Sequence, residues 1–142
     1  MTHAQIRFAV ERGFVEISES NHTAEAAAEA LRAGKSVVIH SRDAEASVVA
    51  KLGSILGEIL RDVLCATKVR RVLIAGGDTS GQIARTLGIE SMEMIAELTR
   101  GSPLVRVSAP NSPADGIEMT FKGGQIGKVD FFTQVQQGRS DV

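Results

Sequence analysis

The stretch from Arg70 to Ala84 constrains the fold of this chain more than any other. Val72–Ile74 is a short apolar, largely β-branched run, which predicts a buried strand. Gly76–Gly77 break that strand, and Asp78–Ser80 are residue types preferred at helix N-caps. A strand, a glycine turn and a helix start together aim free backbone N–H groups at one point. This stretch therefore predicts a loop that holds a phosphate.

The residues of this first glycine loop suggest separate roles. Gly76 and Gly77 offer N–H groups and let a phosphate approach without a Cβ in the way. Thr79 and Ser80 offer hydroxyl and backbone donors. Asp78 is either the helix N-cap or a group that meets the anion through Mg²⁺ or a ribose hydroxyl, and the two roles are compatible.

A second glycine loop, Lys122–Gly127, follows the alternating run at residues 117–121. Lys122 either meets phosphate as a point charge or is solvated at the surface. Gln125 adds an amide donor, and the loop backbone forms a second wall through Gly123, Gly124 and Gly127. The two loops together suggest a nucleotide gripped from two sides. The alternative is a pair of β-turns without a ligand.

Helical and strand patterns alternate along the chain, which is typical of the α/β class. We expect a single domain over residues 1–136, built as a layered mixed sheet flanked by helices, with a polar tail at residues 137–142. Helices are expected at residues 2–12, 21–32, 44–65 and 80–87, with a short one from Asp130. Strands are expected at residues 14–17, 37–39, 72–74, 92–98, 104–107 and 117–121, the fourth being favoured over a helix because its apolar residues largely alternate.

The expected helix at residues 44–65 is amphipathic and carries two glycines four residues apart, Gly53 and Gly57. Charged residues interrupt the segment, so the pair indicates close packing of a neighbouring helix rather than a membrane dimer. The apolar face of this helix suits either a core helix or an oligomerisation surface. Homo-oligomerisation therefore stays open.

Composition excludes several function classes. The 142 residues include five Phe, no Trp and no Tyr, and the net charge is −1, which argues against nucleic-acid or membrane partners. Cys65 is the single cysteine, so a disulfide framework and a cysteine-based zinc site are excluded, and we expect this thiol to be buried. His3, His22 and His40 read as surface residues, and no catalytic residue is assigned. No secretory signal is evident, which makes a cytoplasmic location the default expectation.

Taken together, five motifs resemble the C-terminal nucleotide-binding domain of the four-carbon acid sugar kinases, a family that includes threonate, erythronate and 3-oxo-tetronate kinases. The resemblance covers nearly the whole chain. The motifs are Gly76–Gly81, Gly88–Ile89, Gly101–Leu104, Lys122–Gly127 and Asp130–Phe132. The second loop departs from the usual Lys-Ser-Gly-Asn-Phe-Gly pattern at Gly123, Gln125 and Ile126.

The resemblance implies a nucleotide site for ATP and Mg²⁺, with Gly101 in its wall. It also implies a kinase that phosphorylates a hydroxyl of a four-carbon sugar acid. The acceptor would bind an N-terminal domain, on the same protein or on a companion chain, so this chain is expected to be part of a longer two-domain kinase and inactive alone. The alternative is a non-catalytic nucleotide-binding or regulatory module with a kinase-like fold.

Overall fold

The computed structural model describes residues 1–18, 22–41 and 49–142. Helices and strands alternate through the first half of the chain, and three strands gather in the second half. The elements are α1 (Thr2–Glu11), β1 (Val15–Ser18), α2 (Thr23–Arg32), β2 (Val37–His40), a 3₁₀ turn (Val49–Lys51), α3 (Leu52–Ala66), β3 (Arg71–Ala75), α4 (Gly77–Thr86), β4 (Ser91–Thr99), β5 (Ser102–Ser108), β6 (Glu118–Lys122) and α5 (Phe131–Gln137).

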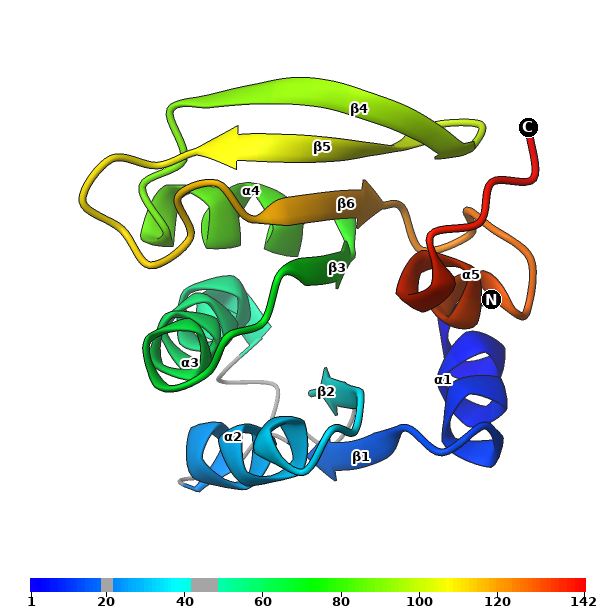
Figure 1. The fold of residues 1–142 in the computed structure, drawn as a ribbon, viewed down its shortest axis with the longest axis horizontal. Coiled ribbons are helices and arrows are strands. Elements are labelled where there is room, and N and C mark those ends of the chain that lie inside the picture. Colours follow the sequence, from blue (N-terminus) through cyan, green and yellow to red (C-terminus); the bar gives the residue numbers. More distant parts are fainter. Residues whose placement is uncertain (19–21, 42–48) are drawn as a thin grey trace.

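The strands form two open sheets. β1 and β2 pair in parallel, and the larger sheet has the order β3-β6-β5-β4. In that sheet β3 and β6 are parallel, whereas β5 pairs with both β6 and β4 in the antiparallel sense. Figure 1 shows β1 and β2 at the bottom of the view, β3 and β6 above them, and β5 and β4 at the top. The α/β fold with mixed strand pairing is confirmed, and its strands are divided between two sheets.

Helices lie on both sides of the strands. α3 packs against α2 and α4, while α1 packs against α5. A Cβ on Gly53 would lie 2.2 Å from the Gln82 side chain, and one on Gly57 would lie 2.8 Å from the Thr86 side chain. The prediction that the two glycines allow close helix packing is therefore confirmed, because α4 fills the space that side chains would need.

Two apolar clusters hold these layers together. One joins α3 and α4 to the larger sheet through buried residues that include Leu64, Ile74, Ile83, Leu87, Val107 and Met119. The other joins α1 and α5 to the strands through Ile6, Ala9, Val38, Leu98, Leu104, Phe131, Phe132 and Val135. Burial of aliphatic side chains is the main stabilising term here, as the scarcity of aromatic residues predicts.

A salt bridge joins register partners on β3 and β6, the two strands that carry the glycine loops. Arg71 Nε and Nη2 both donate to Glu118 Oε2, at 2.8 and 2.6 Å, and Arg71 is the register partner of Glu118. Arg71 Nη1 also donates to the carbonyl oxygen of Val135, 2.9 Å away. This register brings Ala75 opposite Lys122 at the far ends of the two strands.

Cys65, His40 and the helix expected at residues 44–65 differ from the predictions made from the sequence. Cys65 is exposed near the end of α3, because its side chain lies off the buried stripe of that helix. His40 is 8% exposed instead of a surface residue, and its Nε2 lies 2.9 Å from Glu16 Oε1 on the paired strand. Part of the helix expected at residues 44–65 lies outside the described residues, and α3 itself begins at Leu52.

The polar tail carries contacts of its own. The backbone N–H of Asp141 donates to the carbonyl oxygen of Leu98 at 2.9 Å, and the carboxylate of Asp141 lies 3.3 Å from Lys128 Nζ. Within the residues that the structure describes, no helix combines the length and the hydropathy needed to cross a bilayer.

Candidate functional site

Both glycine loops leave the same end of the larger sheet, at the carboxyl ends of β3 and β6. Ala75 and Lys122 are register partners, and the backbone N–H of Gly76 donates to the carbonyl oxygen of Lys122 at 2.9 Å. The loop Gly76–Gly77 and the loop from Gly123 therefore start side by side. In open α/β sheets, ligands bind outside the carboxyl ends of the strands, which is where these loops lie.

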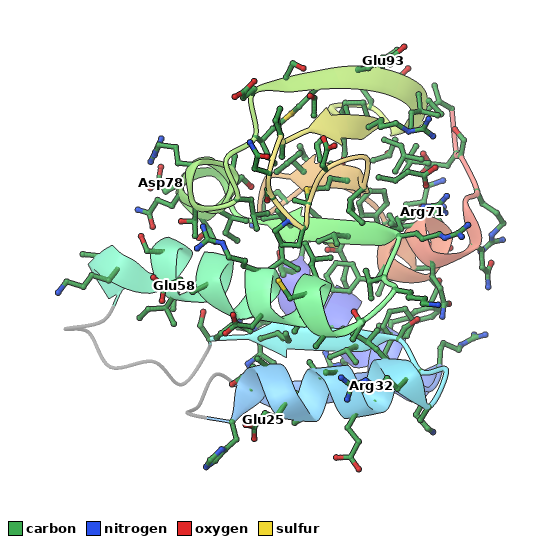
Figure 2. The ribbon with its side chains drawn as sticks, turned by 60° about the vertical axis from the view of Figure 1, so that its left-hand side comes forward. Glu25, Arg32, Glu58, Arg71, Asp78 and Glu93 are labelled. Atoms are coloured by element: carbon green, nitrogen blue, oxygen red, sulfur yellow. The ribbon has the colours of Figure 1, made fainter. Side chains whose placement is uncertain are left out.

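The first loop forms the start of α4. Gly76 is the N-cap, with φ +115° and no side-chain cap, and the helix begins at Gly77. The prediction that Asp78 caps the helix is therefore wrong: Asp78 is in the first turn, and its exposed side chain lies at the end of α4 in Figure 2. The N–H groups of the first three helical residues have no acceptor within the helix, because the first intrahelical bond starts at Ser80.

The hydroxyl groups of Thr79 and Ser80 in this loop make different contacts. Ser80 donates twice to the carbonyl oxygen of Gly76, from its backbone N–H at 2.9 Å and from Oγ at 2.6 Å. Ser80 thus stabilises the turn and keeps neither donor for a ligand. Thr79 Oγ1 lies 3.4 Å from the position of a Cβ on Gly76, so this hydroxyl sits directly against the turn.

Lys122 carries a buried cation at the end of β6, where its backbone carbonyl pairs with Gly76. Its side chain is 2% exposed, and its Nζ donates to Thr2 Oγ1 at 3.2 Å. Burial lowers the pKa of Lys122 from its ordinary value of 10.5, because the charged form loses hydration. Among the described residues, no carboxylate lies within ion-pair distance of this ammonium group. Lys122 is not solvated, and its charge favours an anionic ligand at this end of the sheet.

Helix α1 supports the second glycine loop, a contribution that the sequence analysis missed. Thr2 Oγ1 donates to the carbonyl oxygen of Gly124 at 2.9 Å. Gln5 is fully buried, and its Nε2 lies 2.8 to 3.2 Å from the carbonyl oxygens of Ile126, Gly127 and Lys128. The available signal was a polar residue on the buried face of a short helix, next to Ile6.

The remaining predicted residues surround Ile126. A Cβ on Gly101, in the turn between β4 and β5, would lie 3.5 Å from Ile126 Cδ1, and one on Gly123 would lie at the same distance. Gly101 is therefore brought next to the second loop. Gly127 has φ +84°, and a Cβ there would lie 2.7 Å from Phe131 Cγ, so this position requires glycine. Gly124 and Gln125 are exposed at the outer side of the loop.

The structure offers no preformed metal cage in the part of the chain that it describes. No three His, Cys, Asp or Glu side chains gather there to hold an ion. Asp78 stands as one carboxylate beside the free N–H groups of α4. Nucleotide-bound Mg²⁺ is typically held by one or two carboxylates together with phosphate oxygens and water, so the donor set fits a metal that arrives with a nucleotide.

Comparison with known proteins identifies the family. The model of the family described as "nucleotide-binding C-terminal domain" matches residues 1–132. The chain belongs to this family. It is 36% identical to a 3-oxo-isoapionate kinase of Paraburkholderia graminis, over 86% of the chain and 30% of that protein. It is 35% identical to a 3-oxo-tetronate kinase of Pseudomonas savastanoi pv. phaseolicola, over 56% of the chain and 17% of that protein. The chain thus spans less than a third of these curated relatives.

Two solved structures share the fold of this chain. A domain of unknown function from Bordetella bronchiseptica, described as a domain-swapped dimer with bound citrate, has a TM-score of 0.73 at 17% identity. The match covers 99% of this chain and 39% of that one. A putative tRNA synthase from Salmonella typhimurium has a TM-score of 0.67 at 21% identity, over 99% of this chain and 38% of that one. The family to which the sequence motifs pointed is confirmed.

Proposed function

We propose that this chain is the ATP-binding part of a kinase, with the nucleotide phosphates held between the start of α4 and Lys122. The observation that carries the proposal is the backbone pairing of Lys122, whose ammonium group is buried, with Gly76, after which three N–H groups have no helical acceptor. A cation and a helix N-terminus on adjoining loops both favour an anion. The names of the curated relatives, which are kinases, support ATP as that anion.

Each part of the proposed site has a chemical role. Phosphoryl transfer depends mainly on positioning and on neutralising the charge of the phosphates. The N–H groups of Gly77, Asp78 and Thr79 orient the phosphate chain, and Lys122 neutralises part of its charge. Asp78 would hold Mg²⁺, which supplies further charge neutralisation when bound. Gly101, Gly123 and Ile126 form an outer wall, with Gln125 at its exposed side.

The acceptor in this proposal is a hydroxyl group of a four-carbon sugar acid. The name of 3-oxo-tetronate kinase supports this substrate class. The chain spans 30% of the P. graminis relative, so we assign the acceptor site and the general base to a separate domain, on the same polypeptide or on a companion. We assign no general base within this chain.

Calorimetric titration tests the nucleotide site. We expect ATP and ADP to bind, with Mg²⁺ strengthening the binding of ATP, and a ligand at a hundredfold excess over Kd to stabilise the fold by about 2.7 kcal/mol. Absence of heat and of any thermal shift with both nucleotides would refute the proposal. ATP binding that persists while an acceptor-domain companion gives no turnover would favour a regulatory module.

A further inference from the structure

β4, the outermost strand of the larger sheet, is open along one edge and on both faces. β5 is its only sheet partner in the described part of the chain, so the other edge of β4 is unpaired. Residues 91–95 are all exposed, although successive side chains of a strand point to opposite faces of the sheet. Figure 1 shows β4 at the top of the molecule, beyond β5. Figure 2 shows Glu93 on the same outer strand.

Three large apolar side chains lie on this open segment. Met92, Met94 and Ile95 are 46%, 67% and 43% exposed. Met92 is the register partner of Val107 and Met94 that of Val105, and both valines are buried in the cluster that includes residues of α3 and α4. The two methionines therefore continue the apolar face of the sheet beyond its buried part. An exposed apolar edge strand of this length is a template for pairing with another chain.

The polar tail limits the open edge to the first part of β4. Ser140 Oγ donates to the carbonyl oxygen of Glu97, and the backbone N–H of Asp141 donates to the carbonyl oxygen of Leu98 at 2.9 Å. These two carbonyl groups at the end of the strand are therefore already engaged. Residues 91–96 are the part of β4 that can pair with a further strand.

We propose that this part of β4 pairs, in the antiparallel sense, with β4 of a second copy of the chain, so that the two larger sheets become one. A two-fold axis perpendicular to the sheet places one residue directly opposite the same residue of the other copy. To keep most of residues 91–96 paired, the axis must pass at Glu93 or at Met94. The second copy is the occupant because the charges on β4 suit pairing with itself in one of these two registers.

Charge selects the register centred on Met94. An axis at Glu93 would oppose two carboxylates directly, and an axis at Ile95 would oppose Glu93 to Glu97 of the other copy, which is destabilising in both cases. An axis at Met94 opposes two methionines and places Glu93 opposite Ile95. Glu93 also has Arg106 as its register partner on β5, so a cation stands beside its carboxylate within the same chain.

Two further features of β4 agree with this register. Met94, the most exposed of the three apolar side chains, lies on the axis, where both copies cover it. The register of β4 with β5 shifts between Met94 and Ala96, so Ile95 is the extra residue of a bulge. A bulge bends a strand without ending its ladder. The contact between the copies is therefore a short ladder over residues 92–96 with apolar side chains at its centre.

Sedimentation of the whole chain tests the dimer. We expect a reversible equilibrium of monomer and dimer between about 1 µM and 1 mM, because a contact made by one short strand edge belongs to the weak class of interfaces. Met94→Lys opposes two ammonium groups on the axis and should raise the dimer Kd by about tenfold or more. Val129→Lys, at a residue that is 43% exposed between β6 and α5, is the matched control and should change the Kd by less than about twofold. A monomer over the whole range, or equal effects of the two variants, would overturn the proposal.

A disulfide tests the register. The background is Cys65→Ser, which removes the exposed native thiol. Met94→Cys then places two thiols on directly opposed residues, whose Cα atoms are about 4.5–5.5 Å apart, within the range of a disulfide. Met92→Cys leaves its two thiols about 13 Å apart along the strands. We expect oxidised glutathione to convert the first variant, and not the second, to a covalent dimer on denaturing gels. Crosslinking at residue 92, or no crosslinking at residue 94, would refute the pairing.

Discussion

Replacement of Lys122 by methionine separates nucleotide binding from folding. Lys122 Nζ is a buried donor that contacts Thr2 Oγ1 at 3.2 Å, and no carboxylate in the described part of the chain pairs with it. Methionine keeps much of the length of the side chain and removes the charge. The variant therefore removes the proposed phosphate contact and also removes a buried charge that is costly in the free protein.

The size of the effect follows from the loss of one charge-assisted hydrogen bond. Such a bond is worth about 1.5–3 kcal/mol, so Lys122→Met should raise the Kd for ATP by about 10- to 150-fold. The free energy of unfolding of the free protein should change by less than about 1 kcal/mol, because the lost bond to Thr2 is offset by relief of the buried charge. Calorimetry gives the Kd, and urea denaturation gives the stability.

Lys128→Met is the matched control for this variant. Lys128 also belongs to the region of the second glycine loop, but its side chain is 70% exposed and lies 3.3 Å from Asp141. We expect its replacement to change the Kd for ATP by less than about twofold, since exposed ion pairs contribute little. Equal weakening in both variants, or unchanged affinity in K122M, would refute the role given to Lys122.

The pKa of Lys122, the hydrogen bonds of Gln5 and the packing at Gly57 give three further predictions. The pKa of Lys122 is lowered below 10.5 in the folded protein, so the unfolded chain binds more protons between the folded pKa and 10.5. The free energy of unfolding should therefore rise with pH in that window, as measured by urea denaturation. This slope should vanish in K122M. Gln5→Leu leaves three carbonyl oxygens without their donor and should lower the unfolding free energy by about 1–3 kcal/mol while weakening ATP binding. Gly57→Leu should cost about 1–3 kcal/mol in thermal unfolding because Thr86 occupies the space, whereas Glu58→Leu, on the exposed face of α3, should cost little.

A wild-type slope that survives in K122M would contradict the pH prediction. Unchanged stability of Q5L would show that the second loop does not depend on α1. Equal stability of G57L and E58L would show that α3 and α4 do not pack as closely as the structure indicates.

Local patterns were sufficient to predict most of the elements. The run at residues 72–74 followed by Gly76 and Gly77 predicted β3 and a helix after it, because strand propensity and glycine are read within a few positions. The helix begins at Gly77, three residues before the expected start at residue 80. The strand at residues 92–98 was also predicted correctly, as β4. Alternation of apolar and polar residues and the composition of turns are local signals, so they can be read from the sequence without knowledge of the tertiary packing.

Features that depend on distant parts of the chain were missed. Gln5 and Thr2 contact the second glycine loop across more than 120 residues of sequence, and no local pattern indicates such a pairing. The burial of His40 depends on Glu16 on the neighbouring strand. The exposure of Cys65 depends on the rotation of α3 against its neighbours. These positions are determined by tertiary packing, which overrides residue preferences.

The division of the strands into two sheets is the other feature that local patterns did not predict. Each strand at residues 37–39 and 72–74 was recognised as apolar, but strand order is a property of the whole fold.

A crystal structure of the protein with a nonhydrolysable ATP analogue and Mg²⁺ tests the central claim most directly. We expect phosphate oxygens within hydrogen-bond distance of the N–H groups of Gly77–Thr79 and of Lys122 Nζ, with the second loop, Gly123–Gly127, as the opposite wall. A nucleotide bound elsewhere on the protein, or phosphates that make no contact with Lys122, would contradict this claim.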